Sequence, residues 1–285
     1  MDKQLDLRYI GKMEAKELAV LVLTYGTKGR IVALDQFYTK PEIANQCFST
    51  ISHLTPELWI EPSAGTGSFY TLLPEPRFGI DLEPKCEGVV EGNWLEHTPV
   101  TNNCVVVGNP PFGYRAQGAI EFFNHAAKFS THIAFIVPRS FRKAYIINQL
   151  NPYFHCTVET ILDLGAFIGG ADKIRTVWQV WEKRTTRRPK IVLPKKSPHF
   201  EIVGQGLNFD VTKADIAIRR TGYKAVGEVV DPQTAKPITQ FIFCSGGDRA
   251  IFETLDLSCA WDTALAPTFT QGELIAAYHK RMENK

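Results

Sequence analysis

The chain has 285 residues, of which 44% are hydrophobic and 22% are charged, an ordinary globular composition that argues against disorder. Its 32 Lys and Arg residues nearly balance 30 Asp and Glu residues, so the net charge of +2 excludes a uniformly basic surface. The six cysteines form no CxxC pair and the seven histidines no HxxH pattern, which predicts neither a disulfide scaffold nor a metal site. Without an apolar leader or a spanning segment, we expect a soluble, reduced, cytoplasmic protein.

The predicted elements begin with a helix over residues 13–23, built of good helix formers and ended by Gly26 and Gly29. Short apolar runs bounded by Gly or Pro follow, at residues 58–61, 77–81, 104–107 and 132–137, and two more strand-like runs lie at 160–164 and 176–181. Runs of this kind suit strands buried on both faces of a parallel sheet. With helical stretches such as 116–129 between them, they predict an open, doubly wound α/β sheet of the Rossmann type.

The composition changes at residues 183–199, which contain seven Lys or Arg, three Pro and no acid. This stretch is either a solvated linker or a set of phosphate contacts. Beyond it, the sequence predicts strands at 201–203, 215–219 and 240–243, and a final helix over 273–283.

A small-residue turn follows the first of the buried strands. After Glu61 the chain continues Pro-Ser-Ala-Gly-Thr-Gly, and Gly65 and Gly67 let a ligand lie against the backbone. We expect a helix to begin after this turn and to offer free N–H groups. Asp81, at the end of the next strand, is placed to accept hydrogen bonds from ribose hydroxyls, or alternatively to cap the next element. Glu61 would repel a pyrophosphate, so the pattern favours a nucleoside cofactor that carries a cationic amino acid.

A second motif follows the buried strand 104–107 and reads Asn109, Pro110, Pro111, Phe112. Two prolines make a stiff, extended turn that lacks backbone donors. The Asn109 side-chain oxygen and a neighbouring carbonyl can then hold a planar exocyclic amine, and Phe112 offers a face for stacking. Catalysis at such a corner would consist of positioning and electrostatic complementarity, without a strong base.

Together, Glu61–Gly67 and Asn109–Phe112 resemble the cofactor and catalytic motifs of class I S-adenosylmethionine-dependent amino-methyltransferases, and most closely the N6-adenine type. Residues 37–41 upstream resemble the Tyr-Thr-Pro segment of that family, with Lys40 inserted before Pro41. The resemblance covers about residues 35–183 and implies a seven-stranded methyltransferase sheet that binds S-adenosyl-L-methionine.

The resemblance also implies the positions of the site residues. The catalytic residues that it implies are Asn109, Pro110, Pro111 and Phe112. Asn93, with its apolar neighbours Trp94 and Leu95, matches the place where the family reads the adenine ring. The cofactor contacts are Tyr38, Thr39, Glu61, Ala64, Gly65, Gly67, Asp81, Asn93, Trp94 and Asn109.

Asn in place of Asp in the catalytic motif leaves the acceptor open. The Asn variant occurs in adenine enzymes, and also in enzymes that methylate guanine N2 in ribosomal RNA or the glutamine amide of release factors. Phe112 stands where the glutamine enzymes generally carry Tyr. We therefore expect methylation of adenine N6 in nucleic acid, DNA being favoured over RNA. The alternatives are guanine or glutamine as acceptor, or an inactive nucleic-acid-binding subunit.

Several basic and aromatic residues are candidates for contact with the nucleic acid. One group follows the strand 132–137, a second lies in the glycine-rich loop 165–175 that in the resembled fold overhangs the substrate, and a third follows residue 215. Alternatively, each of these groups is a solvated turn or a flexible connection that does not bind nucleic acid. The candidates are Arg139, Arg142, Lys143, Phe167, Lys173, Arg175, Arg219 and Arg220.

The sequence therefore predicts four parts. They are an N-terminal helical extension (1–34), a cofactor-binding catalytic domain (35–183), a basic linker or loop (184–199) and a C-terminal region that contacts nucleic acid (200–285). No membrane partner is expected, and the oligomeric state is left open.

Overall fold

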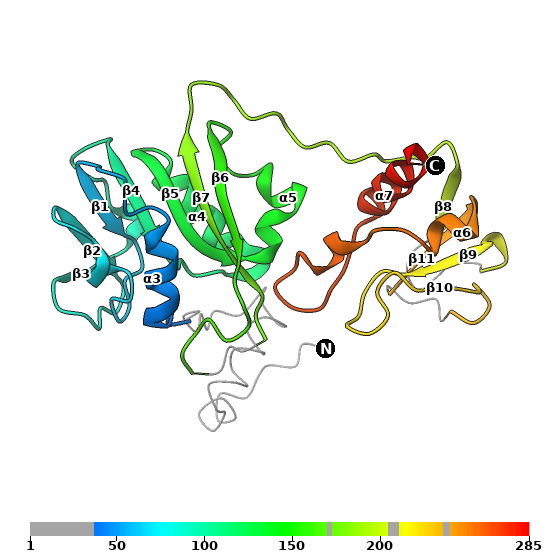
Figure 1. Ribbon diagram of the computed structural model, residues 1–285, viewed down its shortest axis with the longest axis horizontal. Helices are drawn as coiled ribbons and strands as arrows, with labels where there is room; N and C mark the ends of the chain where they lie inside the picture. The colour runs from blue at the N-terminus through cyan, green and yellow to red at the C-terminus, as the bar shows by residue number, and fades with distance from the viewer. Residues whose placement is uncertain (1–36, 170–172, 205–210, 236–239, 285) are drawn as a thin grey trace, which may run out of the picture. The chain divides into compact units, whose positions relative to one another are not determined.

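The computed structural model describes residues 37–169, 173–204, 211–235 and 240–284. The helix predicted over 13–23 lies outside these residues. The chain forms two units (Figure 1). The first unit contains the described residues up to Pro138 together with Asn148–Pro189, and the second contains Arg139–Ile147 together with the residues from Lys190 onward. No helix among the described residues is long and apolar enough to cross a membrane.

The first unit is built on a seven-stranded sheet, which confirms the predicted fold class. Its strand order is β3-β2-β1-β4-β5-β7-β6. Strands β1 to β5 run parallel, whereas β7 runs antiparallel to both of its neighbours. The strands are β1 (Leu58–Glu61), β2 (Arg77–Asp81), β3 (Val89–Glu91), β4 (Cys104–Gly108), β5 (Ser130–Pro138), β6 (Phe154–Ile161) and β7 (Thr176–Lys183).

Helices cover the sheet on both faces. α3 (Pro41–Ser49) begins with proline, which suits the first turn of a helix because the N–H it lacks would be unpaired there. Side chains alternate along β7, so Trp178 and Val180 pack in the cluster of α3, whereas Trp181 meets Phe123 of α4 (Gln117–Ala126) with ring centroids 5.5 Å apart. Every residue of β4 is buried, as expected of a strand covered on both faces.

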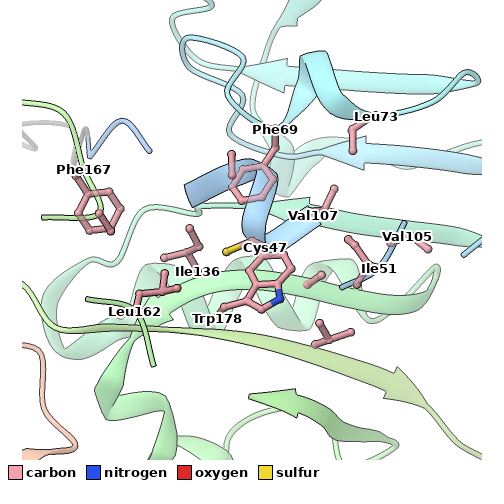
Figure 2. Packing of buried hydrophobic residues seen from close by; sticks show 14 of the residues in the cluster. Cys47, Ile51, Phe69, Leu73, Val105, Val107, Ile136, Leu162, Phe167 and Trp178 are labelled. Carbon is pink, nitrogen blue, oxygen red and sulfur yellow. The ribbon is translucent and has the colours of Figure 1, made fainter. Parts of the chain in front are cut away.

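The main hydrophobic cluster fills the space between α3 and the sheet (Figure 2). Phe69 and Trp178 stack at its centre with ring centroids 5.8 Å apart, and the Trp178 indole N–H donates to the Thr50 hydroxyl at 3.0 Å. Both side chains are fully buried. Phe69 comes two residues after Gly67, the last residue of the glycine-rich turn (residues 61–67), so this packing holds the end of the turn onto the core.

Two expectations about the connections were wrong. No α-helix follows the glycine-rich turn, where only the short 3₁₀ turn η1 (Tyr70–Leu72) forms. Pro74 and Pro76 come soon after it, and prolines cannot continue a helix. The connections β2–β3 and β3–β4 likewise lack an α-helix, the latter holding only η2 (Trp94–Glu96). The strand predicted over 160–164 is β6, which begins earlier and ends at Ile161.

The second unit contains a four-stranded antiparallel sheet in the order β10-β9-β11-β8. As predicted, strands cover 201–203, 215–219 and 240–243 in large part, and a helix covers 273–283. Its helices and 3₁₀ turns pack around Phe252, Phe269 and Tyr278. The elements are η4 (Arg139–Arg142), α5 (Ala144–Ile147), β8 (Phe200–Gly204), η5 (Val211–Lys213), β9 (Ile216–Arg219), β10 (Val229–Val230), β11 (Phe241–Gly246), α6 (Arg249–Phe252), η6 (Ser258–Trp261) and α7 (Gln271–Glu283).

Candidate active site

The candidate site lies at the carboxyl ends of the neighbouring strands β2, β1 and β4. The sheet order reverses between β1 and β4, and open α/β sheets bind their ligands at such a point. Asp81 ends β2, Glu61 ends β1, and Asn109 follows β4. The topology therefore brings together three polar residues that are widely separated in the sequence.

Asp81 holds the glycine-rich turn against the end of β2. One of its carboxylate oxygens accepts the Gly65 N–H at 2.8 Å, and the other accepts the Glu83 N–H at 2.8 Å. Gly65 has a φ of +48°, and a Cβ there would meet the Tyr38 ring at 3.1 Å. Tyr38 and Asp81 thus flank the turn, and a side chain at position 65 would fill the space between them.

Glu61 is a buried carboxyl group with an unused oxygen. It is 2% exposed, and its Oε2 has no hydrogen-bond partner within the described residues. Burial raises the pKa of Glu61 well above its usual value and the charge of Asp81 raises it further, whereas the N–H groups of Tyr70 and Phe69 oppose the shift. Such a group gains from a cation or a hydrogen-bond donor placed beside it.

The Asn109 amide is fixed in one orientation. Its Nδ2 donates to the Phe37 carbonyl at 2.6 Å, and the Ser63 hydroxyl donates to its backbone oxygen at 3.1 Å. Its Oδ1 is buried and has no partner among the residues described here. The side chain therefore presents a free acceptor where the sequence predicts an amine-binding oxygen.

The two prolines are held against the start of α4. A Cβ on Gly118 would lie only 2.7 Å from the Pro111 carbonyl oxygen, so the close contact requires glycine. The Ala119 N–H donates to the Phe112 carbonyl at 3.4 Å. The helix thus fixes the backbone that carries Asn109.

Phe112 lies in an aromatic cluster. Its ring centroid is 5.6 Å from that of Phe37 and 6.3 Å from that of Phe167, and the rings of Phe37 and Phe167 are 5.7 Å apart. Phe112 and Phe167 are 4% and 2% exposed. In this structure the two predicted stacking residues therefore pack against protein side chains in tilted and edge-on arrangements.

The segment around Thr39 pairs with the loop that carries Phe167. Thr39 and Phe167 form an isolated antiparallel bridge, the Lys40 N–H donates to the Ala166 carbonyl at 3.1 Å, and the Ile168 N–H donates to the Tyr38 carbonyl at 2.8 Å. The buried Thr39 Oγ1 has no partner within the described ranges. Thr39, Glu61 and Asn109 thus each carry an unsatisfied buried oxygen, and these atoms suit a ligand with several donors or a positive charge.

The residues predicted to read the adenine ring serve the local structure. The Asn93 Oδ1 accepts the Leu95 N–H at 3.1 Å and caps η2. Trp94 is 1% exposed and packs edge-on against His125 of α4, with ring centroids 5.0 Å apart. The Leu95 side chain is 36% exposed and remains accessible.

The basic candidates are divided between the units. In the first unit Arg175 is buried and Lys173 is exposed. In the second unit Arg219 is paired with Glu228 at 3.1 Å. Arg139, Arg142, Lys143 and Arg220 also lie in the second unit, three of them in one segment after β5.

Two residues that shape the site, Phe37 and Gly118, are not among the site residues predicted from the sequence. The Phe37 carbonyl orients Asn109 across a separation of 72 residues, which no local pattern reveals. Gly118 had a detectable signal, since a glycine in the first turn of a helix lowers its stability unless close packing requires it. No group of three or more His, Cys, Asp or Glu side chains in the described part of the chain is placed to hold a metal ion.

No protein-family model and no curated protein matches the chain. Among solved structures, a protein of Pyrococcus horikoshii described as an RNA methyltransferase is 18% identical, with a TM-score of 0.41, over 60% of this chain and 100% of that chain. A protein of Listeria monocytogenes described as a class I S-adenosylmethionine-dependent methyltransferase is 14% identical, with a TM-score of 0.44, over 62% and 70% of the two chains.

A modification subunit of a type I restriction enzyme of Vibrio vulnificus is 16% identical, with a TM-score of 0.41, over 59% of this chain and 47% of that one.

Proposed function

We propose that this protein transfers the methyl group of S-adenosyl-L-methionine to the N6 amine of adenine in nucleic acid, with DNA favoured over RNA. The observation that carries the proposal is the buried Asn109 Oδ1, which has no hydrogen-bond partner within the described residues, while the bond from Nδ2 to the Phe37 carbonyl fixes the orientation of the amide. An exocyclic amine supplies the missing donor. The contact of Asn109 with Ser63 of the glycine-rich turn supports a proposed amine site next to the proposed cofactor.

The residues present fit S-adenosyl-L-methionine. When bound, it supplies a methyl group on a sulfonium centre. Asp81 offers carboxylate oxygens to the ribose hydroxyls, while the unpaired oxygens of Glu61 and Thr39 suit the cationic amino-acid part. Gly65 leaves the backbone open to the ligand, and Tyr38 lies beside it. The further proposed cofactor contacts are Ala64, Gly67, Asn93 and Trp94.

In the proposed reaction, Asn109 Oδ1 and the Pro110 carbonyl accept the two amine hydrogens and point the nitrogen lone pair at the methyl carbon. Held by Asp81, Glu61 and Thr39, the cofactor would supply its methyl group to that nitrogen and leave as the neutral thioether, and the methylated amine would release one proton to water. Positive charge that develops on the nitrogen is stabilised by the two oxygens, which are already fixed before reaction. No strong base is required at Asn109.

The flat base requires space beside Phe112. Because Phe37 and Phe167 now contact that ring, the base takes the place of one of them when it binds. Phe167 is the better candidate to move. It lies between Gly165 and Gly169, both at positive φ, and a Cβ on Gly169 would meet nothing within 4 Å. A base in duplex DNA must also leave its stack, at a cost of about a few kcal/mol.

The test is incubation with cofactor labelled with tritium on its methyl group, in separate reactions with DNA, RNA and whole-cell protein. The proposal predicts label in adenine, released as the N6-methyl nucleoside after digestion. Label on guanine N2 or on glutamine would support the proposed cofactor and contradict adenine as the acceptor. Lack of transfer to any polymer, with no cofactor binding by calorimetry, would leave a binding subunit as the function.

A further inference from the structure

A connected cluster of charged side chains lies within the second unit. Asp262 contacts the Arg142 guanidinium and lies 3.9 Å from that of Arg139. Lys143 is 4% exposed, and its Nζ donates to Glu273 at 2.7 Å and to the Cys259 carbonyl at 2.7 Å. The Lys143 ammonium group is therefore held by acceptors of the protein, and its ion pair places α7 beside the residue that follows η4.

Arg220 belongs to the same neighbourhood. Its backbone oxygen accepts the Phe269 N–H at 3.3 Å, and the adjacent Thr268 carbonyl accepts from Lys143 Nζ at 3.3 Å. The charge of Glu273 acts on Arg220, whose pKa burial lowers. Arg220 thus brings a fourth cation to a cluster that holds two carboxylates.

The positive charge of this cluster is incompletely balanced. The Nε atoms of Arg139 and Arg220 are buried and have no hydrogen-bond partner within the described residues. Asp256, a further carboxylate nearby, is exposed and accepts the Ser258 N–H at 3.0 Å. Burying a guanidinium N–H without an acceptor is costly, so the two arginines favour an anion that supplies the missing acceptors.

Exposed aromatic side chains occur on the same stretches of the chain. Tyr145, Tyr223 and Trp261 are 51%, 55% and 38% exposed. Tyr145 follows Lys143 by two residues, and Trp261 directly precedes Asp262. Guanidinium groups for phosphate together with aromatic rings for bases form the combination that binds an unpaired nucleic-acid strand.

We propose that Arg139 and Arg220, with Arg142 beside them, form a phosphate-binding site for a single strand of nucleic acid on the second unit, distinct from the Asn109 corner. The inference rests on the proposed function only for the identity of the polymer. Lys143, Asp262 and Glu273 hold the arginines in place and do not contact the strand.

The test measures binding of the full-length protein to a labelled single-stranded oligonucleotide and to its blunt duplex over a series of KCl concentrations. Arg220→Gln and Arg139→Gln are compared with Arg249→Gln, a control on α6 whose arginine is exposed and paired with Glu253. The double variant Arg139→Gln/Arg220→Gln should weaken binding to the single strand. It should lower the slope of log affinity against log salt by about 1.4, or about 0.7 for each phosphate.

Tyr223→Ala should lower affinity for the single strand and leave the salt slope unchanged, because stacking releases no counterions. Unaltered affinity and slope in the double variant, with thermal unfolding as in Arg249→Gln, would overturn the site. Preferential binding to the duplex would do so as well. Methyl transfer and cofactor affinity are measured on the same samples. If the protein shows neither methyl transfer nor cofactor binding, but the double variant loses strand binding, the proposed function is contradicted and the phosphate-binding site is supported.

Discussion

At the residue scale, the proposed function depends on the atoms that the fold leaves without partners. Asn109 Oδ1, Glu61 Oε2 and Thr39 Oγ1 are all buried and unsatisfied within the described residues. Folded proteins pair most buried polar atoms, so three such oxygens near the ends of adjacent strands indicate a ligand site. The predictions for Asn109 and Glu61 follow from this arrangement.

Asn109→Ala should lower kcat by roughly 100-fold or more, the scale expected when one preorganised hydrogen-bonding group is lost. Cofactor affinity should change little, because the Asp81 and Glu61 carboxylates remain. Steady-state transfer assays and calorimetry measure the two quantities. Asn102→Ala, at an exposed position before the same strand, is the matched control and should keep full activity. Equal rates for the two variants would remove Asn109 from catalysis.

Glu61 should make cofactor affinity depend on pH. In the free protein burial raises the pKa of Glu61 well above its usual value, so the carboxyl keeps its proton above the normal range of a glutamate. A cation bound beside it favours the ionised form and releases that proton. Affinity should therefore rise with pH, by at most about tenfold per unit, and level off once the free carboxyl is ionised. Calorimetry in buffers of different ionisation enthalpy detects the proton, and Glu61→Gln should abolish the dependence.

At the scale of elements, α4 determines the geometry of the catalytic corner. Gly118→Ala should improve helix propensity by about 1 kcal/mol, yet the added Cβ meets the Pro111 carbonyl oxygen at 2.7 Å. We expect the corner to shift and turnover to fall at least tenfold, by analogy with other small displacements of reacting groups. Gln117→Ala, exposed on the same helix, is the control. A Gly118→Ala enzyme that is more stable and fully active would contradict this role of the helix.

The buried ion pair of Lys143 and Glu273 joins the residue after η4 to α7, and Lys143→Ala should break that connection. Removing the cation leaves Glu273, which is 10% exposed, without its counter-charge. The loss of stability should be about 3–5 kcal/mol. Denaturant unfolding of the full chain measures it against Arg249→Ala, whose exposed pair contributes less than about 1 kcal/mol. Equal midpoints for the two variants would show that the buried pair does not stabilise the unit.

Sequence patterns predicted the strands better than the connections. Apolar runs such as Cys104–Gly108 are distinctive because both faces of the strand are buried. The helix expected after Gly67 does not form, because Pro74 ends the stretch and Arg77 Nη1 binds the carbonyls of Tyr70 and Leu73. The contacts that orient the site, Phe37 with Asn109 and Thr39 with Phe167, join distant residues and leave no periodic signal.

At the scale of the whole molecule, the chain passes between the units three times, after Pro138, Ile147 and Pro189. The short segment Arg139–Ile147 follows β5 of the first unit and belongs to the second. The sequence predicts this segment within the catalytic domain, because nothing in its residues shows that the partners of Lys143 lie more than 110 positions later. The predicted domain boundaries stay predictions. The structure adds that the segment Arg139–Ile147, within the predicted catalytic domain, belongs to the second unit.

The most direct test of the central claim is to express the protein in a host that lacks adenine methylation and to determine the nucleosides of its DNA and RNA by mass spectrometry. The proposal predicts an N6-methyl adenine nucleoside with the wild-type chain that is absent with Asn109→Ala at equal protein level. Unmethylated adenine in both polymers, or equal methylation by the two proteins, would contradict the claim that the Asn109 corner transfers a methyl group to adenine.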